Sequence, residues 1–194
     1  MKRFLTPLLL FAVLACSKVG LETTDDVCTK MDDINFMKFC YENFDANKDG
    51  KVSMEEAAAG KEFTYTSHSA TELKGIEYFQ NIEVLNLSGN KLSAMDFTRF
   101  PKLKILLLEH NQFTTLDISN CQTLVMLACS WNQLTSIVLP SGITHLWCEK
   151  NKFSALDFSK YPALEHIYCS GNFITNLDVS GTKWSPKYLV SRHS

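Results

Sequence analysis

The fold is decided by a stretch that reads LKILLLEHN over residues 103–111. The same arrangement of apolar positions ending in asparagine returns as LVMLACSWN over 124–132 and as ITHLWCEKN over 143–151. The asparagines of the whole series are separated by 21, 21, 19 and 21 residues, and they are Asn90, Asn111, Asn132, Asn151 and Asn172. One such short unit cannot bury its apolar side chains alone, whereas stacked units can, so the repeat predicts a solenoid.

Each unit follows the pattern LxxLxLxxN, which resembles the leucine-rich-repeat family. The resemblance implies an α/β solenoid over residues 63–184, with about six rungs that each contain a short parallel strand and a return segment. Phe63, Tyr65 and His68 match the pattern weakly and predict an edge rung, with His68 in place of asparagine. Each asparagine side chain is expected to pair with backbone in the turn after the strand. Residues 185–194 are expected to form a C-terminal tail or cap.

Alternate positions of each predicted strand should face outward on the concave sheet, where such a solenoid would bind a ligand. Rung by rung they are Val84, Asn86 and Ser88; Ile105, Leu107 and Glu109; Met126, Ala128 and Ser130; His145, Trp147 and Glu149; His166, Tyr168 and Ser170. The candidate ligand-binding residues among them are Leu107, Glu109, Met126, His145, Trp147, Glu149, His166 and Tyr168.

The two aromatic residues of this face leave two interpretations open. Trp147 beside Tyr168 could stack on a sugar ring or anchor a peptide. The alternative is ordinary cross-strand pairing that stiffens the sheet. His145 and His166 occupy equivalent positions on adjacent rungs, but two ligands are too few to predict a transition-metal site.

Residues 45–56 carry the most specific chemistry in the chain. Asp45, Asn47 and Asp49 alternate, Gly50 stands sixth in the loop, and Glu56 stands twelfth. Ca²⁺ takes six to eight oxygen ligands, so short acidic and amide side chains from one tight loop suit it, with a bidentate glutamate to close the shell. The remaining expected contributions are the backbone carbonyl of Lys51 and a water held by Ser53.

Helical spacing of apolar residues on both sides of this loop makes residues 31–62 resemble an EF-hand, similar to the bacterial single-copy version. That resemblance implies Ca²⁺ as cofactor and a helix–loop–helix that caps the solenoid. The chain shows no second loop of this kind, which favours weak affinity. Ser53 and Glu56 could instead form only a helix capping box, with the aspartates in a solvated turn.

The N-terminus predicts export. Lys2 and Arg3 precede an apolar run that is too short to span a membrane as a mature helix, and the run ends at Ala15 before Cys16. This ending resembles a bacterial lipobox, which implies a signal peptide over 1–15, a lipid on Cys16 and a tether over 16–30. The alternative is an ordinary secretory signal that happens to contain a cysteine.

Seven cysteines fall into separate groups. Cys28 and Cys40 could form a disulfide in an exported chain, provided that Cys28 folds back from a turn that precedes the helix. Cys129, Cys148 and Cys169 stand at inward positions of successive rungs and are expected to act as small buried hydrophobic residues.

Composition narrows the function. The formal net charge is −2 and basic residues are scattered among acidic ones, so no nucleic-acid partner is expected. Motifs for phosphate binding, serine hydrolases, zinc proteases and dinucleotides are missing, so the sequence predicts no enzyme. The prediction is a calcium-binding, lipid-anchored module of the bacterial cell envelope, at the outer membrane or cell surface, that binds a protein or glycan. The alternative is a structural envelope component without a macromolecular ligand.

Overall fold

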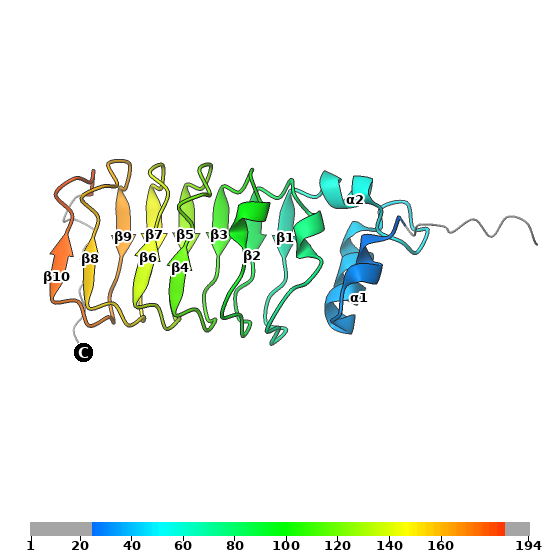
Figure 1. Cartoon of the computed structure of the whole chain (residues 1–194), viewed down its shortest axis with the longest axis horizontal. Coiled ribbons are helices and arrows are strands. Elements are labelled where there is room, and N and C mark those ends of the chain that lie inside the picture. The colour runs from blue at the N-terminus through cyan, green and yellow to red at the C-terminus, as the bar shows by residue number, and fades with distance from the viewer. Residues whose placement is uncertain (1–24, 185–194) are drawn as a thin grey trace, which may run out of the picture.

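The computed structural model describes residues 25–184, so the predicted signal peptide, Cys16 and the C-terminal tail lie outside the described residues. A ladder of strands runs along the molecule, and two short helices lie at its N-terminal end (Figure 1). Six parallel strands form the main sheet in the order β1-β2-β3-β5-β7-β9. They are β1 (Glu62–Thr64), β2 (Val84–Asn86), β3 (Ile105–Leu107), β5 (Met126–Ala128), β7 (His145–Trp147) and β9 (His166–Tyr168). This is a parallel β-solenoid of about six turns, as the repeat predicts.

The central residue of every strand in this sheet points into the solenoid. The paired central residues are Phe63, Leu85, Leu106, Leu127, Leu146 and Ile167, and all of them are buried. Because side chains alternate between faces along a strand, the residues on either side of each centre face outward. The register therefore places the predicted outward positions in straight columns across the rungs.

The return segments differ from the expected α/β arrangement. They contain further short strands, and the helices among them are single 3₁₀ turns at η2 (Ile76–Tyr78) and η3 (Phe97–Arg99). Strands β4 (Thr115–Asp117) and β6 (Ser136–Val138) pair in parallel, as do β8 (Ala155–Asp157) and β10 (Asn176–Asp178). A rung of about 20 residues leaves too few positions between turns for a stable α-helix, so extended backbone fills the return.

A ladder of asparagine side chains joins successive rungs inside the turn that follows each main-sheet strand after β1. Asn132 is typical: its Oδ1 accepts from the Phe113 backbone N–H at 3.0 Å. Its Nδ2 donates to Leu108 O at 2.8 Å in the preceding rung and to Cys129 O at 3.2 Å in its own. Equivalent bonds are made by Asn90, Asn111, Asn151 and Asn172. The amide thus satisfies buried backbone groups in two rungs at once.

Aromatic side chains pack the helical cap against the N-terminal end of the solenoid. Asp33 precedes helix α1 (Ile34–Phe44), and its carboxylate caps the first turn of the helix; α2 (Met54–Ala59) follows the loop. The ring of Phe44 stacks on Phe63 of β1 at 5.2 Å and contacts Phe79 at 4.6 Å. These contacts join the helical cap to the hydrophobic core of the solenoid.

The cap begins earlier than the expected boundary at residue 31. A 3₁₀ turn, η1 (Val27–Lys30), buries Val27 and Cys28 against α1. Residues 26–30 therefore belong to the folded cap, although the sequence assigns them to a tether over 16–30. The buried carboxylate of Asp26 holds this segment in the folded cap, because it accepts hydrogen bonds from Cys28 N and Tyr41 Oη.

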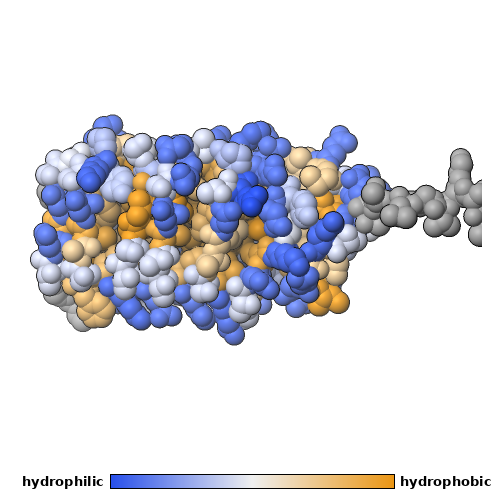
Figure 2. All heavy atoms as spheres, in the orientation of Figure 1, coloured by the Kyte–Doolittle hydropathy of each residue, from blue (hydrophilic) through white to orange (hydrophobic). Residues whose placement is uncertain are grey.

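On the face turned to the viewer in Figure 2, hydrophobic residues gather in a band along the middle of the solenoid, with hydrophilic residues above and below it. Within residues 25–184, none of the helices has the length and apolar character needed to cross a membrane.

Candidate functional site

The outward columns of the main sheet bring the predicted aromatic pair together. Trp147 and Tyr168 pair in register on β7 and β9, and their rings stack at 5.4 Å with an interplanar angle of 6°. Leu107, two rungs before Trp147, lies in the same column. Both aromatic rings remain partly exposed, which leaves their edges available to a ligand.

Two of the positions assigned to this face are not exposed. Ala128 and Ser130 are only 6% and 4% accessible. Ala128 is a small residue between Leu107 and Trp147, and these larger neighbours shield it. Ser130 accepts a hydrogen bond from the Glu149 backbone N–H at 3.2 Å. The part of this face that a ligand could reach is therefore made by its other residues.

The outward face also carries two glutamates, one of which is hydrogen-bonded to the next rung. The Glu149 carboxylate accepts a hydrogen bond from Ser170 Oγ at 2.7 Å. Glu109, at the equivalent position two rungs earlier, is partly exposed. The face thus combines aromatic rings with carboxylates.

The column beside the aromatic pair contains two stacked imidazoles. His145 and His166 lie with ring centroids 4.4 Å apart, next to Met126 in the same column. Thr144 Oγ1 lies 2.8 Å from His145 Nδ1. Burial, and then the nearby charge of His166, lower the pKa of His145 below its ordinary value.

This lowered pKa predicts a loss of stability on mild acidification. The unfolded chain takes up a proton at His145 near pH 6.5, while the native chain resists it until lower pH. The stability that His145 contributes is therefore fully present above pH 6.5 and is lost as the pH falls through the native pKa. Asp117 and Asp157 lose their contributions nearer pH 3.8, because hydrogen bonds from Ser119 and Ser159 lower their pKa values. We expect urea midpoints at pH 7.5 and 5.5 to differ less for His145→Gln than for the parent, and equal differences would contradict this assignment.

The loop of residues 45–56 has a backbone shaped for oxygen ligands that point inward. Lys48 and Gly50 adopt positive φ angles of 60° and 82°. The Asp45 carboxylate accepts from Asp49 N at 3.1 Å and from Gly50 N at 2.9 Å, and Asn47 Oδ1 accepts from Asp49 N at 2.9 Å. Asp45, Asn47 and Asp49 are therefore joined by hydrogen bonds within one tight turn.

Glu56 closes the loop from its other end. Its Oε1 accepts from Ala46 N at 2.9 Å and from Asn47 N at 3.2 Å, so the carboxylate reaches the start of the loop. Its Oε2 accepts from Ser53, and Ser53 Oγ caps α2, which forms the capping box that the sequence suggested as an alternative. Hydrogen bonds from Ser53 and then Asn47 lower the pKa of Glu56. The capping box and a calcium site are compatible in this geometry.

The loop's carboxylates satisfy backbone N–H groups rather than meeting at one point. Across residues 25–184, His, Cys, Asp and Glu side chains do not gather in a group of three that could hold a metal. Repulsion between carboxylates favours this spread. The side-chain donors of Asp45, Asn47, Asp49, Ser53 and Glu56 are oxygens, the atoms that Ca²⁺ prefers as ligands.

Sequence reasoning missed how the loop is supported from behind. Val52, in its middle, accepts at its carbonyl from Val27 N at 2.9 Å and donates its N–H to Asp26 Oδ1 at 3.1 Å. Asp26 is 5% exposed and lies 26 residues before its partner in the chain. Its segment is polar and resembles a tether, so only the carboxylate itself could have signalled the contact.

Cys28 and Cys40 are free thiols in the structure, and they lie side by side in the buried core of the cap. Cys28 folds back from η1 onto α1, which is the condition set by the sequence analysis. The adjacent Cys28 thiol and burial raise the pKa of Cys40 well above its ordinary range. Cys129 and Cys148 are buried, as expected for small hydrophobic residues, whereas Cys169, expected to be buried with them, is partly exposed in the last rung of the main sheet.

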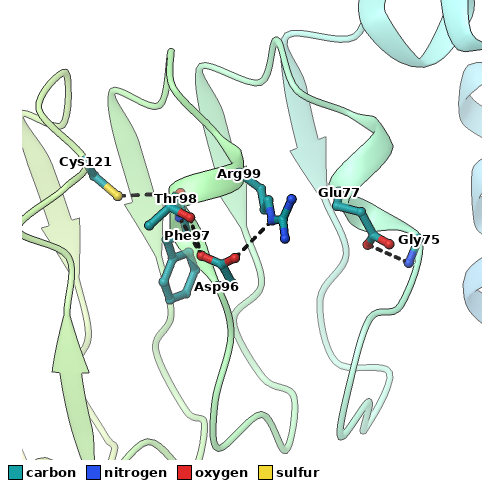
Figure 3. Close-up of polar contacts among 7 residues, drawn as sticks. All are labelled: Gly75, Glu77, Asp96, Phe97, Thr98, Arg99 and Cys121. Carbon is teal, nitrogen blue, oxygen red and sulfur yellow. Dashed lines mark hydrogen bonds and ion pairs between the residues drawn. The ribbon is translucent and has the colours of Figure 1, made fainter.

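A second overlooked feature is a groove of about 480 Å³ between η2 and η3 on the return side. Figure 3 shows Asp96 and Arg99 on one wall, paired at 3.0 Å, and Glu77 on the other, hydrogen-bonded to the backbone of Gly75. Asp96, Arg99 and Glu77 have partners in their own walls, and Lys74 of the lining pairs with Asp32 at 2.6 Å, so these four charged groups are already engaged.

A third feature is a column of left-handed residues at the rim of the main sheet. In the six described rungs, the residue before each Asn ladder position, or before His68 in the first rung, has a positive φ, and these residues are Ser67, Gly89, His110, Trp131, Lys150 and Gly171. Glycine adopts this conformation freely, whereas another residue costs about 1 to 2 kcal/mol. His110, Trp131 and Lys150 therefore add strain of about 3 to 6 kcal/mol in three consecutive rungs. The recurrence of glycine at this position was the sequence signal that could have located the column.

Comparisons with known proteins agree with this architecture. Residues 81–103 match the family model described as Leucine Rich Repeat. A search of curated proteins finds no significant match.

Two solved structures from Listeria monocytogenes are similar in fold. An internalin (InlF) has a TM-score of 0.54 at 16% identity, and the match covers 84% of this chain and 67% of that one. The functional domain of InlJ, described as including a cysteine ladder, has a TM-score of 0.52 at 23% identity, covering 82% of this chain and 48% of that one. This chain thus spans about two thirds of the first and about half of the second. The repeat match over residues 81–103 and the shared architecture make the described chain similar in fold to leucine-rich-repeat solenoids.

Proposed function

We propose that the solenoid is a non-enzymatic module that binds a protein through the outward columns of its main sheet. The observation that carries this proposal is the in-register stack of Trp147 on Tyr168 beside His145 and His166. Large amphipathic rings held rigidly on a sheet offer contact area at little entropic cost, which is typical of binding hot spots. The similarity to internalin structures supports a binding scaffold. A glycan remains the second class of ligand, because the same rings could stack on sugars.

The test is the double variant Trp147→Ser with Tyr168→Ser, screened with the parent on protein and glycan arrays. We expect the parent to bind protein spots and the double variant to lose at least about tenfold in affinity without a change in fold. Phe173→Ser is the matched control, because Phe173 is 71% exposed and lies outside the sheet columns. Binding to glycan spots alone would replace the protein partner with a sugar. Failure to bind on both arrays would favour the structural envelope component.

We further propose that residues 45–56 bind Ca²⁺. Asp45, Asn47, Asp49 and Glu56 would supply side-chain oxygens, Lys51 a carbonyl, and Ser53 a bridging water. The preformed turn and the reach of Glu56 to the loop start support this assignment. The ion would supply a structural cross-link between α1 and α2 at the end of the solenoid.

The location we propose is the bacterial cell envelope, with a lipid on Cys16. The proposal rests on the N-terminal sequence, and the bacterial origin of both similar structures is consistent with it. In an oxidising compartment the adjacent thiols of Cys28 and Cys40 would form a disulfide. Counting alkylated thiols in the unreduced chain tests this pairing.

A further inference from the structure

The side chains of the left-handed column in the three central rungs form a continuous ridge, here defined as His110, Trp131 and Lys150. The His110 and Trp131 rings stack at 5.2 Å with an interplanar angle of 15°. Lys150 Nζ lies 5.7 Å from the Trp131 ring centroid. Trp131 is nevertheless 53% exposed, so its edge projects from the rim of the sheet.

The turn itself does not require these side chains. The backbone N–H groups of His110, Trp131 and Lys150 donate to carbonyls of the following rung at 3.1, 2.9 and 2.8 Å. Gly89 makes the same bond to Glu109 O at 2.9 Å with no side chain at all. Strained non-glycine residues that persist where glycine would serve are typical of functional positions.

We propose that this ridge contacts an acidic segment of the protein partner, an inference that rests on the proposed protein-binding function. The Lys150 ammonium and the Trp131 indole N–H can only donate hydrogen bonds, which favours a ligand rich in acceptors. Lys91 and Lys152 lie exposed at equivalent positions just beyond the ladder, Lys152 donating to Gln133, and they extend the positive charge along the rim. Carboxylates of the partner would meet these cations while an apolar side chain packs on the edge of Trp131.

Two carboxylates limit the direction of approach. Glu109 and Glu149 lie on the sheet side of the ridge, and Glu149 already accepts a hydrogen bond from Ser170. An acidic segment crossing the sheet there would meet like charge. It therefore runs along the outer rim, from Lys91 toward Lys152, while the rest of the partner contacts the aromatic pair.

The test uses a phage-displayed random peptide library selected on the immobilised chain. We expect the enriched peptides to be rich in Asp and Glu, and their affinity to fall at least about tenfold on Trp131→Gly and severalfold on Lys150→Gly. Because glycine relieves the left-handed strain, the thermal midpoint of Trp131→Gly should stay equal to that of the parent or rise. Ser67→Gly is the matched control, since it makes the same backbone change in the edge rung and should leave peptide affinity unchanged.

Four results would overturn the inference. A lower thermal midpoint for Trp131→Gly would make the ridge a structural stack. Enrichment of basic or neutral peptides would exclude the acidic segment, and so would binding of the anionic polysaccharide heparin without any acidic peptide. Loss of array binding in the Trp147 and Tyr168 double variant, with ridge variants unaffected, would remove the ridge but leave the proposed function intact.

Discussion

Replacing Asn132 with alanine should lower the free energy of unfolding by about 3 kcal/mol. The change leaves the buried Phe113 N–H without its acceptor and opens a small void between two rungs. The carbonyls are less affected, since Leu108 O keeps Asn111 Nδ2 at 3.1 Å and Cys129 O keeps Asn151 Nδ2 at 3.0 Å. Urea denaturation followed by circular dichroism measures the effect.

The solenoid supplies matched controls for this prediction. Gln133→Ala alters the exposed neighbour of Asn132 and should change the unfolding free energy by less than about 0.5 kcal/mol. Asn172→Ala changes the last described ladder asparagine, which is less buried, and should cost less than Asn132→Ala. Equal midpoints for Asn132→Ala and Gln133→Ala would show that the ladder contributes little to stability.

The ladder shows why so much of the fold could be predicted from sequence. Asparagine spacing and inward leucines specify one rung. Each further rung has the same pattern and buries its apolar side chains against its neighbours in the same way. The register of the outward columns follows directly, because strand side chains alternate. His68 replaces asparagine in the edge rung, where its ring stacks on Tyr65 at 3.9 Å.

Features that depend on contacts between distant segments, or on backbone conformation, could not be predicted from the repeat pattern. The return strands have single inward residues such as Leu116 and Leu156, too few to distinguish a strand from a turn. The left-handed column depends on backbone conformation, and the residue types of Trp131 and Lys150 do not indicate a positive φ. The support of Val52 by Asp26 joins segments whose sequences suggest no contact.

Calcium should stabilise the chain, and its effect should depend on Glu56. At a free concentration a hundred times the dissociation constant, binding adds about 2.7 kcal/mol to the free energy of unfolding. For a domain of this size that corresponds to a rise of about 5 to 10 °C in the thermal midpoint. Phe44, at the end of α1, contacts Phe63 and Phe79 of the solenoid core, so stabilisation of the loop should extend beyond the cap.

The measurement is a set of thermal melts with calcium, with magnesium at equal concentration, and with chelator. Glu56→Gln keeps the side-chain volume but removes the charge that closes the shell, so it should abolish the calcium-dependent rise. Glu55→Ala is the matched control, because Glu55 is an exposed neighbour in the same first turn of α2 and should preserve the rise.

Comparing melts within each variant matters for this interpretation. Glu56 also accepts hydrogen bonds from Ala46, Asn47 and Ser53, so its replacement lowers stability even with chelator present. Only the difference between calcium and chelator reports on the ion. Because hydrogen bonds lower the pKa of Glu56, its contribution is present above pH 4.5 and is lost as the pH falls through the native pKa. Identical melts of the parent in calcium and chelator near neutral pH would reduce residues 45–56 to a capped turn, and the sheet face would remain the candidate binding site.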